Sequence, residues 1–414
     1  MNMHNLATVC FLTAFFVIAQ RSMGDDSPQS GQPTEEQLAA AKGAFAALGG
    51  SYQYRGVYKM HSEDFHMFGL PLGATDADLE KIPKVPFPFA LSLVSNKLTD
   101  AAMPSLRKQT ELEALTLGGT DLTDAGLKEL VPLGKLRILD LSYSFDINDE
   151  GMKTVGAFRS LEGLALNNTS ITDAGLEHLA GLGSLKTLSL NDVPNLTGTG
   201  LRELGQLQQL TRLYLSLSPI TNEGFLKLGP HKKLQVLHIS YTKVTDAGLK
   251  ELNNLPGLVE LGLSATEITD KGLAEVAALK QLEELSLSAT KITDAGLKEL
   301  RPLENLKELS LSSTSVTDKG VAELSTLKNL TRLDLIRTKV TGTGFAELED
   351  LPLEELNLDQ AAVTDAGMKE IAKVKSLTEL NLNRAVLSDV GMKELGKLAN
   401  LKELKLNRVA LSEV

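Results

Sequence analysis

The sequence predicts an α/β solenoid, a horseshoe with a parallel β-sheet on its concave face and short helices on its convex face. Three observations lead to this fold class. A unit of mostly 24 residues recurs through the greater part of the 414-residue chain. Leucine dominates the apolar residues, while aromatic residues make up only 4% and tryptophan is absent. Within each unit the apolar spacing is first that of a strand and then that of a helix. Stacked units of this kind share one continuous core.

The first element is an apolar run of 14 residues from Leu6 to Ala19, too short to span a bilayer comfortably. Small residues precede possible cleavage points after Ala19 and after Gly24, so residues 1–24 are predicted to be an export signal. No Lys or Arg precedes the apolar run, and a retained anchor is therefore an alternative. Cys10, the single cysteine, lies in this segment, and a mature chain would have neither disulfides nor a thiol nucleophile. The predicted location is exported: periplasm, cell surface or medium.

The next two segments lead into the repeats. Residues 25–34, DDSPQSGQPT, have the composition of a polar linker. Residues 35–63 are predicted to form an N-terminal cap from an Ala-rich helix over 35–48 and a following strand. A solenoid needs such a cap because its first repeat would otherwise expose the core.

Residues 64–414 are predicted to form about fifteen repeats, the last of them truncated. The pattern is L-x-x-L-x-L-x-x-[TS]-x-[IVL]-T-D-x-G-[LM]-x-x-[LI]-x-x-L-x-x. Two less regular copies cover 64–87 and 88–111. The regular copies begin at Leu112, Leu136, Leu161, Leu185, Leu210, Leu234, Leu258, Leu282, Leu306, Leu330, Leu353, Leu377 and Leu401.

One repeat illustrates the physical reading of all of them. Leu285 and Leu287 alternate with polar residues, as in a strand with one solvated face. Thr293 then precedes the helical segment, where a threonine side chain caps the first turn. Gly296 stands inside that segment although glycine costs about 1 kcal/mol of helix propensity. We therefore expect the following repeat to approach the backbone closely at Gly296.

The L-x-x-L-x-L signature at a fixed period is that of leucine-rich repeats. The phrase TDAGLKEL, at 123–130, 245–252 and 293–300, resembles exported bacterial leucine-rich-repeat proteins. It is also similar to the repeats of eukaryotic F-box substrate receptors. The resemblance covers about 350 residues by repeat count. The segment before the repeats leaves no room for a helical F-box, and bacterial leucine-rich-repeat ubiquitin ligases need a cysteine that the mature chain lacks. The resemblance therefore implies the solenoid and not a ligase.

A cluster of aromatic and basic residues is the first candidate for a binding site. Repeat positions 3, 5, 7 and 8 are predicted to face the concave side, and Tyr and Arg are common interface anchors. Ordinary surface variation is the alternative. The candidate ligand-binding residues are Arg212, Tyr214, Leu217, His238, Tyr241 and Tyr143.

The second candidate is an acidic ladder at position 3 of successive strands, formed by Glu260, Glu284 and Glu308 and interrupted later by Arg332. Like charges on neighbouring strands repel and would favour a basic partner or a cation. The alternative is a solvated face in which these carboxylates pair with Lys307 and Lys402. No spacing of ligands predicts a metal site.

The sequence predicts a binding protein without enzymatic activity or cofactor. His238 has no Ser or Cys nucleophile in an obvious relation to it, and no H-E-x-x-H or P-loop motif is present. The net charge of −11 argues against nucleic acid as a partner. We expect a protein or surface-polymer ligand on the concave face and no membrane span after removal of the signal. The alternative function is assembly of the cell envelope by self-association through an uncapped C-terminal repeat edge.

Overall fold

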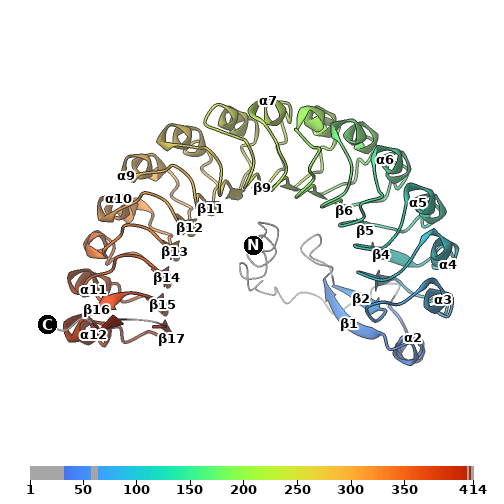
Figure 1. The fold of residues 1–414 in the computed structure, drawn as a ribbon, viewed down its shortest axis with the longest axis horizontal. Helices are drawn as coiled ribbons and strands as arrows, with labels where there is room; N and C mark the ends of the chain where they lie inside the picture. Colours follow the sequence, from blue (N-terminus) through green and yellow to red (C-terminus); the bar gives the residue numbers. More distant parts are fainter. Residues whose placement is uncertain (1–31, 57–63, 408–409, 412–414) are drawn as a thin grey trace.

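The computed structural model describes residues 32–56, 64–407 and 410–411. These residues form a horseshoe in which strands line the inner side of the arc and helices lie along the outer side (Figure 1). The described strands make one sheet of 16 strands in chain order and a separate pair, β16 and β18. In the large sheet β1 and β2 are antiparallel and all later neighbours are parallel. The predicted solenoid with a parallel concave sheet is confirmed.

The strands of the repeats are mostly three residues long. In the large sheet they are β1 Ser51–Gly56, β2 Asp64–Gly69, β3 Phe89–Ser92, β4 Leu112–Thr116, β5 Ile138–Asp140, β6 Gly163–Ala165, β7 Thr187–Ser189, β8 Arg212–Tyr214, β9 Val236–His238, β10 Glu260–Gly262, β11 Glu284–Ser286, β12 Glu308–Ser310, β13 Arg332–Asp334, β14 Glu355–Asn357, β15 Glu379–Asn381 and β17 Glu403–Lys405. The separate pair is β16 Val386–Leu387 and β18 Ala410–Leu411.

The helices are short, and several of them are 3₁₀ helices. The α-helices are α2 Glu35–Ala47, α3 Asp76–Leu79, α4 Met103–Leu106, α5 Asp124–Leu130, α6 Asp149–Val155, α7 Asn222–Phe225, α8 Leu273–Val276, α9 Asp294–Leu297, α10 Asp318–Ala322, α11 Asp365–Ile371 and α12 Asp389–Leu395. The 3₁₀ helices are η1 Asp100–Ala102, η2 Asp173–Leu179, η3 Thr199–Gln206, η4 Gly248–Asn254, η5 Asp270–Gly272, η6 Lys298–Leu300, η7 Glu323–Thr326 and η8 Thr343–Glu347.

The core is a continuous stack of leucines between the sheet and the helices. The middle residue of each repeat strand points into it: Leu285 of β11 is aligned with Leu261 of β10 and Leu309 of β12, and all three are buried. One apolar cluster runs from Ala41 to Leu398. Burial of each leucine stabilises the fold by about 1.5–3 kcal/mol, so the stack supplies the dominant favourable contribution.

A ladder of hydrogen bonds joins neighbouring repeats on the outer side of this core. The Thr293 hydroxyl accepts a hydrogen bond from the backbone amide of Ala295, which confirms the predicted cap. The carboxylate of Asp270, in the preceding repeat, accepts hydrogen bonds from the Thr293 amide (2.8 Å) and hydroxyl (2.7 Å). The same arrangement recurs in Asp100–Thr123, Asp149–Thr172, Asp246–Thr269, Asp294–Thr317 and Asp318–Thr341.

The recurring glycine makes room for this ladder. A Cβ atom on Gly296 would overlap the Oδ1 atom of Asp270 and would lie 3.0 Å from a methyl carbon of Leu273. The prediction that the following repeat approaches Gly296 was therefore wrong, because the close neighbour belongs to the preceding repeat. The periodicity of a single chain does not tell which of two equivalent neighbours a helix face contacts.

At the N-terminal end of the described chain, α2 covers the first strands. Thr34 and Gln37 form a capping box at its start, and the ring of Phe45 stacks on that of Phe68 with centroids 4.6 Å apart. The domain boundaries stay predictions, and the predicted signal over 1–24 lies outside the described residues. Every helix in the described ranges is too short or too polar to cross a membrane.

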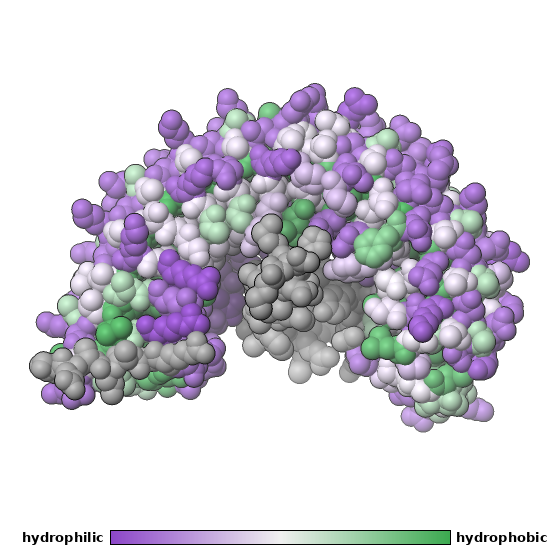
Figure 2. Space-filling model, in the orientation of Figure 1, coloured by the Kyte–Doolittle hydropathy of each residue, from purple (hydrophilic) through white to green (hydrophobic). Residues whose placement is uncertain are grey.

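At the other end, β17 follows β15 as the last strand in the order of the large sheet. Leu404 in β17 is 38% exposed, whereas the equivalent leucines of the inner strands are buried. The predicted self-association through this edge stays a prediction. In the view of Figure 2 the outer surface of the horseshoe is largely hydrophilic, with isolated apolar residues.

Candidate ligand-binding face

The first and third residues of each repeat strand point away from the leucine core. They form two rows across the concave face, because neighbouring strands are in register. From β8 to β13 the first row is Arg212, Val236, Glu260, Glu284, Glu308 and Arg332, and the second is Tyr214, His238, Gly262, Ser286, Ser310 and Asp334. Three of the six predicted ligand-binding residues, Arg212, Tyr214 and His238, thus lie in the same two rows as the acidic ladder.

Tyr214, His238 and Glu260 are in contact on three consecutive strands. The Nε2 atom of His238 lies 2.6 Å from an Oε1 atom of Glu260, to which it donates a hydrogen bond. The rings of Tyr214 and His238 meet edge to face with centroids 5.1 Å apart. A Cβ atom on Gly262 would lie 3.1 Å from the imidazole ring, so a side chain at position 262 would crowd His238. Arg212, the next basic residue, is half-buried beside this group on β8.

The environment of Tyr214 keeps its phenol neutral. Burial, together with the negative charge of Glu260, raises the pKa of Tyr214 to about 12, and Arg212 opposes this shift. A neutral phenol is a hydrogen-bond donor and acceptor with an apolar ring. Tyr214 can therefore contribute apolar contact and a polar tip to a ligand.

The acidic ladder has the register that the sequence predicts. Glu284 on β11 is aligned with Glu260 on β10 and with Glu308 on β12. Burial, followed by the charges of Glu260 and Glu308, raises the pKa of Glu284 to about 7. Burial also raises the pKa of Glu308, and Arg332 acts in the opposite direction.

The predicted partners of the ladder were wrong in one respect. Lys307 binds Glu283, whose carboxylate lies 2.7 Å away, and not Glu308. The counter-ion within the row is Arg332, which the sequence presents only as an interruption. Its guanidinium lies 2.7 Å from Glu308 on one side and 2.7 Å from Glu355 on the other. Lys307 directly precedes Glu308 in the chain and binds Glu283, the residue before Glu284. The sequence alone did not tell with which of these carboxylates Lys307 would pair.

Tyr143, Leu217 and Tyr241 lie outside the strands, in the turns that follow them. The strands of these repeats end at position 5, so position 8 lies in the turn after each strand, and the predicted role of these three residues in binding stays a prediction. All three residues have left-handed backbone conformations, with φ between 58° and 64°. The two tyrosine side chains are each 56% exposed. They therefore line the rim of the concave face beside the turns.

A left-handed residue recurs at this position in most repeats. Residues of several kinds occupy it elsewhere: the small Gly119, Ala265 and Ala289, the polar Asn168 and Asp192, and the long Arg337, Gln360 and Arg384. The left-handed conformation costs a residue with a bulky side chain roughly 1–2 kcal/mol. The tyrosines and Leu217 are thus placed where the fold itself favours glycine or asparagine.

The described residues hold no group of three or more His, Cys, Asp or Glu side chains suited to a metal ion. His238 uses Nε2 for Glu260, and no described hydrogen bond joins its ring to a hydroxyl nucleophile. This face offers rings, carboxylates and a guanidinium for contacts with a ligand.

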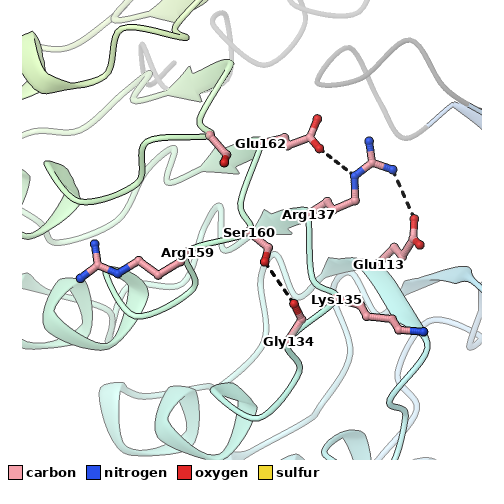
Figure 3. A pocket seen from close by; sticks show the side chains of 8 residues that line it. Glu113, Gly134, Lys135, Arg137, Arg159, Ser160 and Glu162 are labelled. Carbon is pink, nitrogen blue, oxygen red and sulfur yellow. Dashed lines mark hydrogen bonds and ion pairs between the residues drawn. The ribbon is translucent and has the colours of Figure 1, made fainter.

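A shallow depression at the start of β5 and β6 is a separate feature of the surface (Figure 3). Arg137 crosses it between the carboxylates of Glu113, at 3.3 Å, and Glu162, at 2.9 Å. Lys186 binds Glu162 as well, at 2.6 Å. Because the opposite charges alternate along this row and are paired, the depression is explained by ion pairs between repeats.

Four segments of the chain match a family model described as leucine-rich repeat, at residues 231–252, 280–300, 303–325 and 375–396. These matches and the sheet of repeated short strands decide the architecture. The fold is a leucine-rich-repeat solenoid.

Solved leucine-rich-repeat structures share this fold. An internalin from Listeria monocytogenes superposes with a TM-score of 0.59 and 23% identity, over 88% of this chain and 94% of the internalin chain. A leucine-rich-repeat protein from Leptospira interrogans gives a TM-score of 0.53 and 24% identity, over 73% of this chain and 80% of that one. No curated protein matches the sequence.

The pKa of Glu284 leads to a first prediction about the solenoid. The folded state binds the proton of Glu284 more tightly than the unfolded state does, so this contribution to stability is complete below about pH 4.5 and is lost as the pH rises through 7. Glu284→Gln should therefore stabilise the protein by about 1–2 kcal/mol at alkaline pH, allowing for solvent screening, and should have little effect below about pH 5.

The measurement is urea denaturation across that pH range. Glu283→Gln is the matched control, because it removes the same charge from a neighbouring residue that is paired with Lys307. Equal pH profiles for the two variants would contradict the assignment of the titration to Glu284.

Proposed function

We propose that this protein is an exported, non-enzymatic scaffold that binds a protein or surface polymer with the concave face of its solenoid and the adjoining rim. The observation that carries the proposal is the exposure of Tyr143 and Tyr241 at strained rim positions. Tyrosine is enriched among residues that anchor interfaces. Tyr214, His238, Arg212 and Leu217 extend this surface.

Export is proposed from the sequence. It rests on the apolar run from Leu6 to Ala19 and on the small residues before the two cleavage points, all in a segment outside the described residues. N-terminal sequencing of the protein purified from its source tests it. A mature chain starting at Gln20 or Asp25 supports export with cleavage, and a cytoplasmic chain starting at Met1 contradicts it.

Binding through this face predicts a specific loss in capture experiments. The chain is immobilised and exposed to the envelope fraction and culture medium of its source, beside the double variant Tyr214→Ala/Tyr241→Ala. We expect the captured partner to bind at least about tenfold more weakly to the double variant, because each anchor tyrosine is worth more than about 1 kcal/mol.

Tyr54→Ala is the matched control for that experiment. Tyr54 is 54% exposed, similar to Tyr241, but it belongs to β1 at the far end of the sheet. Thermal denaturation of each variant separates loss of binding from loss of folding. A partner that binds the double variant and the wild type equally well would place the binding site elsewhere.

A further inference from the structure

A second apolar cluster lies on the concave side of the sheet, apart from the leucine core. We call it the apolar stripe; it consists of Phe65, Ala90, Ala114, Ile138 and Ala165, with Met67 packed against them. The stripe crosses five neighbouring strands, from β2 to β6. Further along the sheet the same rows carry charged residues such as Glu260 and Glu284. The two parts of the concave face therefore differ in chemistry.

Ile138 is buried although its neighbours in the row are too small to cover it. It is aligned with Ala114 on β4 and with Gly163 on β6, and its exposed fraction is 0%. Glu284, which has a glutamate on each side, keeps part of its surface exposed. The described helices lie on the outer side of the arc, so none of them covers Ile138 (Figure 1).

A buried hydroxyl group beside the stripe lacks a hydrogen-bond partner. Thr116 is the last residue of β4 and points to the same side of the sheet as Ala114, two residues earlier. Its exposed fraction is 8%, and within the described chain its Oγ1 atom has no hydrogen-bond partner. An unpaired buried hydroxyl is unfavourable. The covered isoleucine and the unpaired hydroxyl thus point independently to a further group on this side of the sheet, one that can offer both apolar and polar atoms.

The N-terminal part of the chain has a segment of fitting chemistry and reach. The run from Leu6 to Ala19 is apolar over 14 residues, and its backbone offers polar atoms to a hydroxyl. The described chain begins at Gln32, whose Oε1 atom lies 3.3 Å from Nε2 of His66 on β2, the strand where the stripe begins. The 12 residues between Ala19 and Gln32 can span about 40 Å when extended. The far end of the stripe, on β6, is about 19 Å from β2.

The connection between β1 and β2 is the other candidate cover, and it is too short for the whole stripe. Residues 57–63 join two antiparallel strands, so both of their ends are held at the edge of the sheet. Seven residues held in this way reach at most about 14 Å from that edge, which is less than the distance to β6. The sequence of this connection, VYKMHSE, is also largely polar.

We propose that in the uncleaved chain the apolar run from Leu6 to Ala19 packs on the apolar stripe, and that removal of the leader opens this part of the concave face. The inference goes beyond the proposed function, because it assigns to the leader a role on the protein itself in addition to export. The stripe ends on β6, two strands before Tyr214 on β8. The docked leader therefore blocks access to one part of the candidate binding face until it is cut off.

Cys10 makes this contact measurable, because it lies inside the apolar run and is the single cysteine of the chain. The full chain is treated with a thiol reagent at neutral pH, and the reaction rate is compared with that of the same chain unfolded in urea. A thiol packed on the stripe reacts only while the run is detached. We expect the folded chain to react at least about tenfold more slowly, which corresponds to a docked population of about 90% or more.

Two glutamate variants in one row separate docking on the stripe from other causes of protection. Ile138→Glu places a charge in the middle of the stripe and should raise the reaction rate of Cys10 at least about fivefold. Val236→Glu makes a similar change on β9, outside the stripe, and should change that rate less than about twofold. Neither residue belongs to the leucine core, and thermal denaturation checks the folding of both variants.

Disulfide trapping locates the run and leaves the stripe apolar. Ala114→Cys, in the stripe, and Ser286→Cys, on β11, each add one thiol to that of Cys10 in the full chain. Under mild oxidation by glutathione disulfide, we expect the intrachain disulfide to form at least about tenfold faster in Ala114→Cys, because docking raises the effective concentration of the two thiols.

Equal reaction rates of Cys10 in the folded and the unfolded chain would overturn the proposal. So would equal effects of the two glutamate variants, or equal trapping in the two cysteine variants. Protection that increases with protein concentration, together with disulfides between chains, would assign the stripe to the apolar run of a second copy instead. The proposed function is tested separately: a Cys10 that reacts freely leaves the tyrosine-dependent capture of a partner unaffected, and loss of that capture leaves the docking of the leader unaffected.

Discussion

Gly296→Ala is expected to destabilise the protein by about 3 kcal/mol, although the same substitution usually favours a helix. The added methyl group would occupy the position of the Asp270 carboxylate oxygen and crowd Leu273. Either α9 moves outward or Asp270 releases its two hydrogen bonds to Thr293. Each hydrogen bond contributes about 1 kcal/mol, and overpacking adds about 1–3 kcal/mol, so both outcomes are costly.

Urea denaturation of Gly296→Ala beside Gly43→Ala checks this expectation. Gly43 lies inside α2, and a methyl group there would have no atom within 4 Å. The control should gain up to about 1 kcal/mol of stability, because alanine restricts the unfolded chain and favours the helix. If the same Gly→Ala change lowers the stability at Gly296 and raises it at Gly43, the space between repeats, and not helix propensity, determines the change in stability at Gly296. A neutral Gly296→Ala would refute the role given to Asp270.

The repeat that contains Gly296 also illustrates which features of the fold can be predicted from the sequence. The 24-residue period and the alternation around Leu285 are sufficient for the solenoid, because they fix which residues are buried in every repeat. The cap at Thr293 follows from residue type alone. What Gly296 contacts does not follow, since a repeat has two neighbours and the sequence is nearly identical in both directions. The bonding of Asp270 to the next threonine is a property of the stacked repeats.

On the candidate binding face, too, the sequence predicts which residues are aligned on neighbouring strands but not which side chains they contact. The alignment of Glu260, Glu284 and Glu308 follows from the equal length of the repeats, and the structure has it. The partners of these side chains depend on which way each long side chain turns. Lys307 turns to Glu283, and Arg332 divides its guanidinium between two strands. Rotamer choices of this kind leave no periodic trace in a sequence.

The rim residues were identified by type and placed less well. Tyr143 and Tyr241 attract attention because the chain has few aromatic residues. Their left-handed conformations could have been anticipated from the asparagine and aspartate at the same repeat position, Asn168 and Asp192, which tolerate positive φ. That pattern would have predicted that the tyrosines lie in the turn after the strand and not in the strand itself.

Arg332→Gln is expected to lower the free energy of unfolding by about 2–3 kcal/mol at pH 8. The effect is large because the single guanidinium of Arg332 separates two groups of carboxylates. Its loss leaves Glu308 and Glu355 without their shared counter-ion, 2.7 Å from each in the native protein. Two half-buried charges are then uncompensated in the continuous acidic row that runs along the sheet. The penalty should fall as the pH is lowered, because the unpaired carboxylates take up protons, and it should fall in about 1 M salt, where the screening length is about 3 Å.

The matched control for this charge change is Arg107→Gln. Arg107 binds Glu129 at 3.3 Å, and both of these side chains are well exposed. An exposed pair of this kind contributes about 0.2–1 kcal/mol, and its removal should show little dependence on pH or salt. Urea denaturation at about pH 8 and pH 5, with and without salt, compares the two variants. If Arg332→Gln lowers the stability no more than Arg107→Gln does, the acidic row is solvated well enough to need no counter-ion.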